Sequence, residues 1–419
     1  MRQDNKEPMM NRRASLALLA GLLMFPAACF AAPPDPYLFV WAGDADDKAS
    51  DFLAVIDADP ASPRYGAIVA SLPTGQSGTH PHHTEHEMSA NGHLLANGFH
   101  AGRTWLIDLT KPLEPRILTS FDDLAGYSHP HTFIRMDNGN VLATFQYGAS
   151  RNSSHSVENT TGGLIEMTEL GEVIRTGSAR DNRIPDPRIY PYSVLPLPAI
   201  DRAVSTTTDM DHTNEKATSE WVQFWRLSDL TLLKSIALTP GPKGDEHKLS
   251  GEPRLLPDGK SIYIHTFSCG LYLLRGVADA EPAARLVHSF PGFGCGVPVL
   301  TGHYWLQPVP ETHALVALDI SDPEKPREVS SVTFGDDEEP HWIAIDPSGR
   351  RVVLNSGGKG NRLFIVNFDP ATGKLALDER FRDPDDQRPG ISMTGRSWPH
   401  GFTGNAAPHG TVFSKGTEE

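Results

Sequence analysis

A loose repeat runs through this chain and constrains its fold more than any other sequence feature. Each copy begins with a polar residue, continues as a β-rich run, crosses a turn of the Asp-Gly or Asn-Gly kind and enters a second β-rich run. The clearest copies are His131–Gly139, Glu252–Gly259 and His341–Gly349. Internal repeats are typical of proteins whose sheets stack or close into a ring. The repeat is therefore a better guide to the fold of this chain than its length.

The spacing of the copies matches that of propeller blades. Copies that start at residues 86, 131, 192, 252, 297, 341 and 400 follow one another at intervals of 44 to 61 residues, which fits four-stranded blades with variable loops. We therefore expect an all-β, seven-bladed β-propeller. Residues 37–73 carry strands but no start of their own. They are expected to complete the blade opened by His400, so that N-terminal and C-terminal strands close the ring together.

Short β-rich runs support this interpretation, because turn clusters of Gly, Pro, Asp and Asn separate them and no long amphipathic helix period follows the N-terminus. The best runs are Leu38–Trp41, Phe52–Ile56, Trp105–Leu109, Trp221–Trp225 and Leu363–Phe368.

The N-terminus has the pattern of a secretory signal. Arg12 and Arg13 precede an apolar run at 16–25, and small residues follow at 28–32. We expect residues 1–31 to be a signal peptide and residues 32–419 to form a single propeller domain in the periplasm or outside the cell. Attachment of a lipid at Cys29 is the alternative form of processing. No second apolar run is long enough to span a membrane, so no transmembrane domain is expected after cleavage.

Charge and cysteine content narrow the partners and the compartment. The formal net charge of −15 disfavours binding to nucleic acid and is compatible with small neutral or cationic ligands. Beyond the signal, the cysteines are Cys269 and Cys295. In an oxidising compartment we expect them to form a disulfide, with two separate thiols as the alternative.

Most of the 18 histidines are expected on one face of the ring. In a four-stranded blade, the residues that begin the innermost strand surround the mouth of the central channel, and those that end the second strand lie just outside them. Histidines fall at the first kind of position in several copies, and His265 falls at the second. Neutral imidazole is a common ligand of copper, zinc, iron and nickel. A ring of this kind therefore predicts a metal site, with hydrogen-bonded histidines lining a wet channel as the alternative.

The segment His-Pro-His-His-Thr-Glu-His at 80–86 is the sharpest local signal. Adjacent side chains of a regular strand point to opposite faces, so His82 and His83 are not both expected to be ligands unless the segment is irregular. Carboxylates are expected to orient the imidazoles from behind. The candidate metal ligands are His82, His83, His86, His129, His131, His265, His341 and His400, and the candidate supporting carboxylates are Glu85, Glu252 and Asp211.

Other catalytic signatures are missing from the sequence. It contains no Gly-x-Ser-x-Gly nucleophile motif, no P-loop, no dinucleotide-binding Gly-x-Gly-x-x-Gly and no Cys-x-x-Cys-His haem attachment site. Chemistry in this chain is therefore expected to depend on a bound ion.

Three segments resemble the family of selenium-binding proteins and methanethiol oxidases: His82-His83-Thr84, His129-Pro130-His131, and the run from Leu256 to His265. The resemblance implies a seven-bladed propeller. Bacterial members are exported, copper-dependent oxidases that convert methanethiol to formaldehyde, sulfide and peroxide. It further implies copper held by His82, His83, His131 and His265, with a contribution from His341 or His400.

Three classes of function remain open at this level. The leading expectation is a copper-dependent oxidoreductase that acts on a small molecule such as a thiol. The second is a metal-binding protein without turnover, for copper storage or delivery. The third is a propeller that binds a partner while its histidines line the channel. A calcium-dependent lactonase is disfavoured, because calcium prefers carboxylate and amide oxygens to imidazole.

Overall fold

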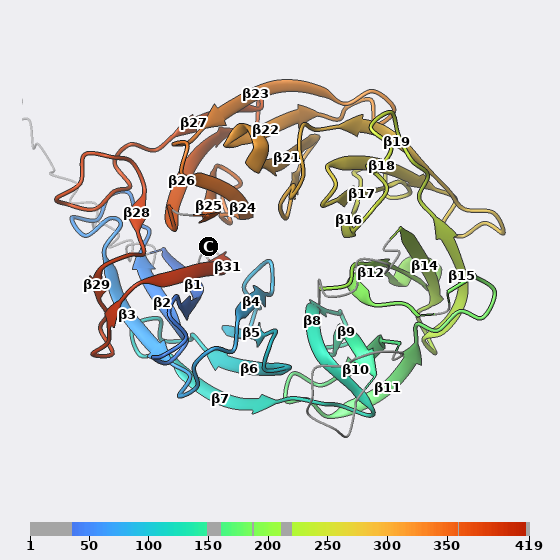
Figure 1. Ribbon diagram of the computed structural model, residues 1–419, viewed down its shortest axis with the longest axis horizontal. Coiled ribbons are helices and arrows are strands. Elements are labelled where there is room, and N and C mark those ends of the chain that lie inside the picture. The colour runs from blue at the N-terminus through green and yellow to red at the C-terminus, as the bar shows by residue number, and fades with distance from the viewer. Residues whose placement is uncertain (1–35, 149–160, 187, 211–219, 359, 416–419) are drawn as a thin grey trace, which may run out of the picture. The chain divides into compact units, whose positions relative to one another are not determined.

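The computed structural model describes residues 36–148, 161–186, 188–210, 220–358 and 360–415. The predicted signal peptide and Asp211 lie outside these residues. Within them, seven sheets are each built on a path of four antiparallel strands, and a separate two-stranded sheet stands beside them; the seven are arranged as a ring around a common centre (Figure 1). The expectation of a seven-bladed all-β propeller is confirmed. No helix among the described residues has the length and apolar character that a membrane crossing requires.

Six blades follow the chain from the innermost strand outward, in sequence order. The first three blades are β4 (Pro81–Thr84), β5 (His93–Gly98), β6 (Arg103–Asp108) and β7 (Arg116–Phe121); β8 (Tyr127–Arg135), β9 (Val141–Gly148), β10 (Gly163–Met167) and β11 (Val173–Ser178); and β12 (Pro191–Leu197), β13 (Arg202–Thr207), β14 (Trp221–Arg226) and β15 (Thr231–Ala237). The next three are β16 (Ser250–Leu255), β17 (Ile262–Thr266), β18 (Gly270–Arg275) and β19 (Ala283–Ser289); β20 (Val299–Thr301), β21 (Tyr304–Val309), β22 (Ala314–Asp319) and β23 (Arg327–Thr333); and β24 (Glu338–Ile345), β25 (Arg351–Gly358), β26 (Arg362–Asp369) and β27 (Lys374–Leu377), with β28 (Ile391–Ser392) on β26. Short 3-10 turns, η1 (Pro198–Ile200) and η2 (Pro310–Thr312), lie in two connections.

The seventh blade joins the two ends of the described chain. Its innermost strand is β31 (Ala406–Phe413), and it is completed by β1 (Tyr37–Asp44), β2 (Phe52–Asp57) and β3 (Ile68–Pro73). Residues 37–73 thus complete the last blade as expected. In Figure 1 the red β31 lies beside the blue β1. This closure leaves the ring without a free edge between its first and last blades.

Two of the expected blade starts are wrong. The first inner strand is Pro81–Thr84, so His86 follows the strand instead of opening it. The last inner strand begins at Ala406, whereas His400 lies in the tight turn between β29 (Arg396–Ser397) and β30 (Thr403–Gly404). The Pro-His pair at 399–400 resembles a blade start, but the backbone N–H of Gly401 bonds to the carbonyl of Trp398 and turns the chain there.

Apolar side chains between neighbouring blades form the core. Both faces of a middle strand are covered by adjacent sheets, so every residue of β1 and β2 is buried, and both runs are apolar until they end at Asp44 and Asp57. Trp41 packs against Trp105 of the next blade, with ring centroids 5.4 Å apart. The outermost strands are partly exposed and alternate, as in β7. The packing holds the inner strands at fixed positions around the channel.

Candidate metal centre

Three imidazoles meet at the centre of the ring. His82 and His83 come from β4 and His131 comes from β8, and one ligand nitrogen of each lies within 4.8 Å of the others. All three side chains are buried. We call them the three-histidine group. The inner strands of two neighbouring blades thus supply one compact set of nitrogen atoms.

The neighbouring His82 and His83 both contribute because β4 is not a regular strand. Its pairing with β5 shifts register between Pro81 and Thr84, and a bulge of this kind re-aims side chains. The two rings stack on each other with centroids 4.4 Å apart and an angle of 14°. The expectation that they point apart holds only for a regular strand, and the irregular case is the one observed.

Hydrogen bonds fix which nitrogen of His131 is available. Nδ1 lies 2.8 Å from the carbonyl oxygen of Tyr192, and since a carbonyl only accepts, Nδ1 must donate. The neutral ring therefore carries its lone pair on Nε2, and this buried atom has no hydrogen-bond partner among the described residues. An imidazole whose N–H is held by a carbonyl is the usual arrangement of a metal ligand.

Two further hydrogen bonds hold His83. The hydroxyl of Tyr192 lies 3.1 Å from Nε2 of His83, and the backbone N–H of His83 bonds to the Asn97 side chain at 2.6 Å. Asn97 also donates to the carbonyl of Pro130 at 2.6 Å, so one amide ties the two histidine-bearing strands together. Nδ1 of His82 and Nδ1 of His83 are buried without a partner among the described residues.

Burial keeps these rings neutral. It lowers the pKa of His131 to about 4, and it lowers the pKa values of His82 and His83 well below the usual range, with further lowering from neighbouring imidazoles. A neutral imidazole is the form that binds a metal ion, so no proton has to leave at neutral pH. The geometry, the unpartnered nitrogens and the protonation state all fit a transition metal with nitrogen ligands.

His409 is a histidine that the sequence analysis did not include among the candidates. It lies between His341 and the three-histidine group and contacts both. The ring of His409, on β31, lies 4.2 Å from that of His82. Its Nε2 is 3.1 Å from Nε2 of His341, on β24, and burial lowers the pKa of His341 to about 4. Pro408-His409 repeats the Pro-His pairs at 81–82, 130–131 and 340–341, which is the signal that could have found it.

Glu252 is the centre of a polar cluster that also contains Ser193, Arg254 and His86. Its carboxylate accepts from Ser193 Oγ at 2.6 Å and from Arg254 at 2.8 Å, and it lies 3.5 Å from Nε2 of His86. Burial raises the pKa of Glu252, but Arg254 and His86 outweigh it and hold that pKa well below its usual range. His86 stacks on Trp342 with centroids 5.0 Å apart. Glu252 therefore contacts a predicted histidine, although not one of the three.

His265 lies next to Glu252 but in a different hydrogen-bonded state. The backbone N–H of Glu252 donates to its Nδ1 at 2.9 Å, which leaves the proton of the neutral ring on Nε2. Burial lowers its pKa to about 3. The ring therefore has no free lone pair as it stands.

Two expected ligands and one expected carboxylate lie elsewhere. The His129 ring packs against Phe99 and Tyr147, and Nδ1 of His400 lies 2.7 Å from the Ser71 hydroxyl. Neither is brought to the three-histidine group, since His129 has a positive φ that breaks the regular alternation of β8, and His400 lies in a turn.

Glu85 pairs with Arg135 at 2.7 Å and accepts from the backbone N–H of Leu95. Its carboxylate thus bonds to the Arg135 guanidinium and to the backbone of the sheet.

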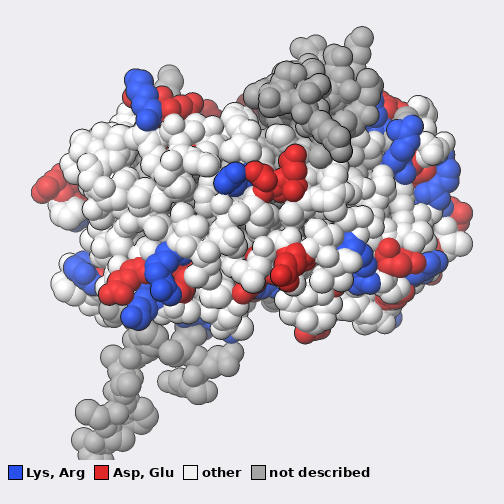
Figure 2. All heavy atoms as spheres, turned by 90° about the horizontal axis from the view of Figure 1, so that it is seen from below, with Lys and Arg blue, Asp and Glu red and all other residues white. Residues whose placement is uncertain are grey.

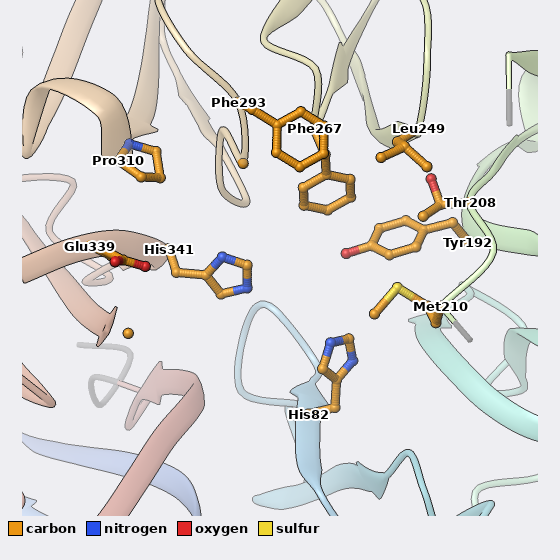
Figure 3. Close-up of a pocket in the computed structure, with 12 residues that line it drawn as sticks. His82, Tyr192, Thr208, Met210, Leu249, Phe267, Phe293, Pro310, Glu339 and His341 are labelled. Carbon is orange, nitrogen blue, oxygen red and sulfur yellow. The ribbon is translucent and has the colours of Figure 1, made fainter. Parts of the chain in front are cut away.

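A cavity of about 300 Å³ opens beside the three-histidine group. Figure 3 shows His82 and His341 on one side of it and the rings of Tyr192, Phe267 and Phe293 on the other. The disulfide expected between Cys269 and Cys295 is present, with Cα atoms 5.1 Å apart, and it lies beside the loop that carries Phe293.

Sequence comparisons match part of the chain to proteins of known name. It is 28% identical to methanethiol oxidase of Hyphomicrobium sp over 149 residues, which are 33% of this chain and 31% of that protein. It is 27% identical to selenium-binding protein 2 of Arabidopsis thaliana over 140 residues, 28% of each chain. The matches thus span about a third of these relatives. No protein-family model matches the chain.

Solved structures extend the likeness to the whole fold. A hypothetical selenium-binding protein from Sulfolobus tokodaii superposes with a TM-score of 0.71 at 17% identity, over 92% of this chain and 94% of that one. A periplasmic gluconolactonase from Pseudomonas aeruginosa gives a TM-score of 0.59 at 14% identity, over 90% and 99%. Likeness at such identities concerns the fold alone. The chain is thus a seven-bladed β-propeller that resembles methanethiol oxidase and the selenium-binding proteins over part of its sequence, and a selenium-binding protein in its fold.

Proposed function

We propose that this protein is a copper-dependent oxidoreductase that oxidises a small thiol, in the manner that the name methanethiol oxidase describes for its relative. The observation that carries the proposal is the three-histidine group, whose ligand nitrogens lie within 4.8 Å of one another. Buried nitrogens without partners on His82, His83 and His131 support a bound ion.

His82, His83 and His131 would hold the metal. Copper there would supply a Lewis acid that lowers the pKa of a thiol and a centre through which electrons can pass. The chain itself supplies the surroundings: Tyr192 keeps His131 and His83 in place, and the cavity beside His82 admits a small molecule. For methanethiol, the balanced reaction takes one O₂ and one H₂O and gives formaldehyde, hydrogen sulfide and hydrogen peroxide. Oxygen is thus the oxidant that accepts the electrons.

The proposed compartment is the periplasm or the exterior. Its support is the signal-like N-terminal sequence together with the disulfide, since such bonds persist in oxidising compartments.

The test is sulfide release from methanethiol in air by copper-loaded protein. We expect product with the wild-type chain and with His400→Ala, which changes a histidine outside the group, and none with His131→Ala. Copper bound in a fixed ratio without sulfide would refute oxidation of methanethiol and would favour storage or delivery. Failure to take up copper would refute the proposal as a whole.

A further inference from the structure

The wall of the cavity opposite the histidines is formed by a loop that the fold holds firmly. Phe293 stands between Gly292 and Gly294, both with positive φ, and Cys295 joins this loop to Cys269. The backbone N–H of Gly294 donates to the carbonyl of Phe267 at 2.7 Å. A short loop fixed at both ends presents its side chain at a constant place.

Lys243 adds a second restraint to the same loop. Its ammonium group donates to the carbonyl oxygens of Phe290 and Gly292, at 3.1 and 3.2 Å. Gly292 has no room for a side chain, because a Cβ there would lie 2.2 Å from Cβ of Glu311. The loop is thus clamped between a cation and a neighbouring turn.

Phe293 itself is 59% exposed and faces the cavity. An exposed aromatic ring on a fixed loop is costly to keep in water, and it marks a binding surface when it lines a pocket. Phe267 and Tyr192 continue the aromatic wall, with ring centroids 5.3 Å apart. The wall leads to the metal centre directly, since the Tyr192 ring also lies 4.1 Å from that of His131.

The opposite side of the cavity is polar, and its described residues carry no Lys or Arg side chain. His82 and His341 line it with imidazole nitrogens, and the carboxylate of Glu339 lies at its edge (Figure 3). An anionic ligand would meet this carboxylate without a compensating charge from the described lining residues, among which there is no Lys or Arg. The lining therefore favours a neutral molecule with one polar end.

The volume sets the size of such a molecule. About 300 Å³ is the space of roughly ten water molecules, which is much larger than a one-carbon thiol needs. We propose that this cavity binds a neutral ligand of about eight to ten non-hydrogen atoms whose aromatic or branched body packs on Phe293 and Phe267 and whose polar end faces His82 and His341. Phe293 is then a specificity-determining residue of the proposed metal centre.

The inference rests on the proposed function only where it treats the ligand as a substrate. Binding itself needs no metal, so the test uses metal-free protein. Ligand-observed NMR titrations would compare benzyl alcohol, benzoate and ethanol. We expect benzyl alcohol to bind at least tenfold more tightly than ethanol, which lacks the ring, and more tightly than benzoate, which has the same body with a negative charge.

Variants then locate the binding. Phe293→Ala should lower the affinity for benzyl alcohol about five- to tenfold, because it removes one aromatic contact and the apolar area buried in it. Phe293→Leu should restore most of the affinity. Ile174→Ala, which removes an exposed apolar side chain from the outer strand β11, should leave it unchanged, and circular dichroism would check that each variant is folded.

Equal binding of benzyl alcohol and ethanol, or equal affinities of Phe293→Ala and Ile174→Ala, would overturn the inference. Copper titration of the same samples separates the two proposals. Selective benzyl alcohol binding without copper uptake would refute the proposed function alone, whereas copper uptake without selective binding would refute this inference alone.

Discussion

At the scale of single residues, the candidate centre depends on hydrogen bonds that leave imidazole nitrogens unused. The Tyr192 carbonyl accepts a hydrogen bond from Nδ1 of His131, and the Tyr192 hydroxyl approaches Nε2 of His83. Each contact fixes a ring without occupying the nitrogen that would face an ion. Residues outside the candidate ligand set thus hold its rings in place, and Asn97 is the clearest example.

Asn97→Ala should destabilise the fold by about 1–3 kcal/mol, because it leaves the backbone N–H of His83 and the carbonyl of Pro130 buried and unpaired. The free energy of unfolding in urea measures the loss. Asn182→Ala, at an exposed asparagine, is the matched control and should change the stability by less than about 0.5 kcal/mol. Equal stabilities of the two variants would show that Asn97 does not hold the strands.

The metal-free protein should lose stability between pH 6.5 and about pH 4. The unfolded state takes up protons near pH 6.5, while burial lowers the folded-state pKa of His131 and His341 to about 4. The unfolded state therefore binds more protons in this window, and stability falls as the pH falls. Urea unfolding at pH 7.5 and pH 5.0 measures the difference. A His341→Gln variant should show a smaller loss, and an equal loss would contradict the assignment.

At the scale of elements, the inner strands are irregular where the site is built. Pairing shifts register between Pro81 and Thr84 in β4, between Pro130 and Phe133 in β8, and between Pro340 and Trp342 in β24. Proline cannot donate to the ladder, so it favours a bulge. In each case a histidine directly follows the proline within the irregular stretch, where a bulge can re-aim its side chain.

This irregularity explains how far sequence reasoning could go. Blade spacing predicted the fold and the ring closure. His82, His83 and His131 were among eight candidate ligands, and blade spacing alone did not separate them from the other five. The stacking of His82 on His83 was not predictable, because strand alternation assumes a regular pleat and the bulge breaks it. His400 and His409 both follow a proline, and only the turn at Gly401 distinguishes them. The role of Asn97 depends on contacts between blades that no local pattern reveals.

Removing the disulfide should cost about 3–4 kcal/mol in the chain-entropy account, since Cys269 and Cys295 close a loop with a sequence separation of 26. The double variant Cys269→Ser/Cys295→Ser tests this through urea unfolding under oxidising conditions. Under reducing conditions the wild-type chain serves as the control and should approach the stability of the variant. No difference between variant and wild type in oxidising buffer would contradict the stabilising role.

At the scale of the whole molecule, closure of the ring brings histidines from distant stretches of chain to one place. β31 supplies the inner strand of the last blade and His409, and it pairs with β1 from the other end of the described chain. Figure 2 shows acidic and basic side chains side by side on one face of the molecule. Positive and negative charges are thus mixed on that face. The candidate metal centre, in contrast, is buried among the inner strands.

A chain that ends at Asn405 should fail to fold cooperatively, because it lacks β31 and exposes the edge of β1 together with its apolar faces. Thermal unfolding followed by circular dichroism measures this. A chain that ends at Lys415 keeps the whole strand and should melt as the full chain does. A cooperative transition in the shorter chain at the same temperature would show that the closure is dispensable.

Copper titration of the metal-free protein, with bound metal determined after removal of excess ion, tests the central claim most directly. The account predicts a fixed stoichiometry of tight binding for the wild-type chain and for His400→Ala, and loss of that binding in His83→Ala and His131→Ala while both stay folded. Unchanged copper content in His83→Ala and His131→Ala would contradict it.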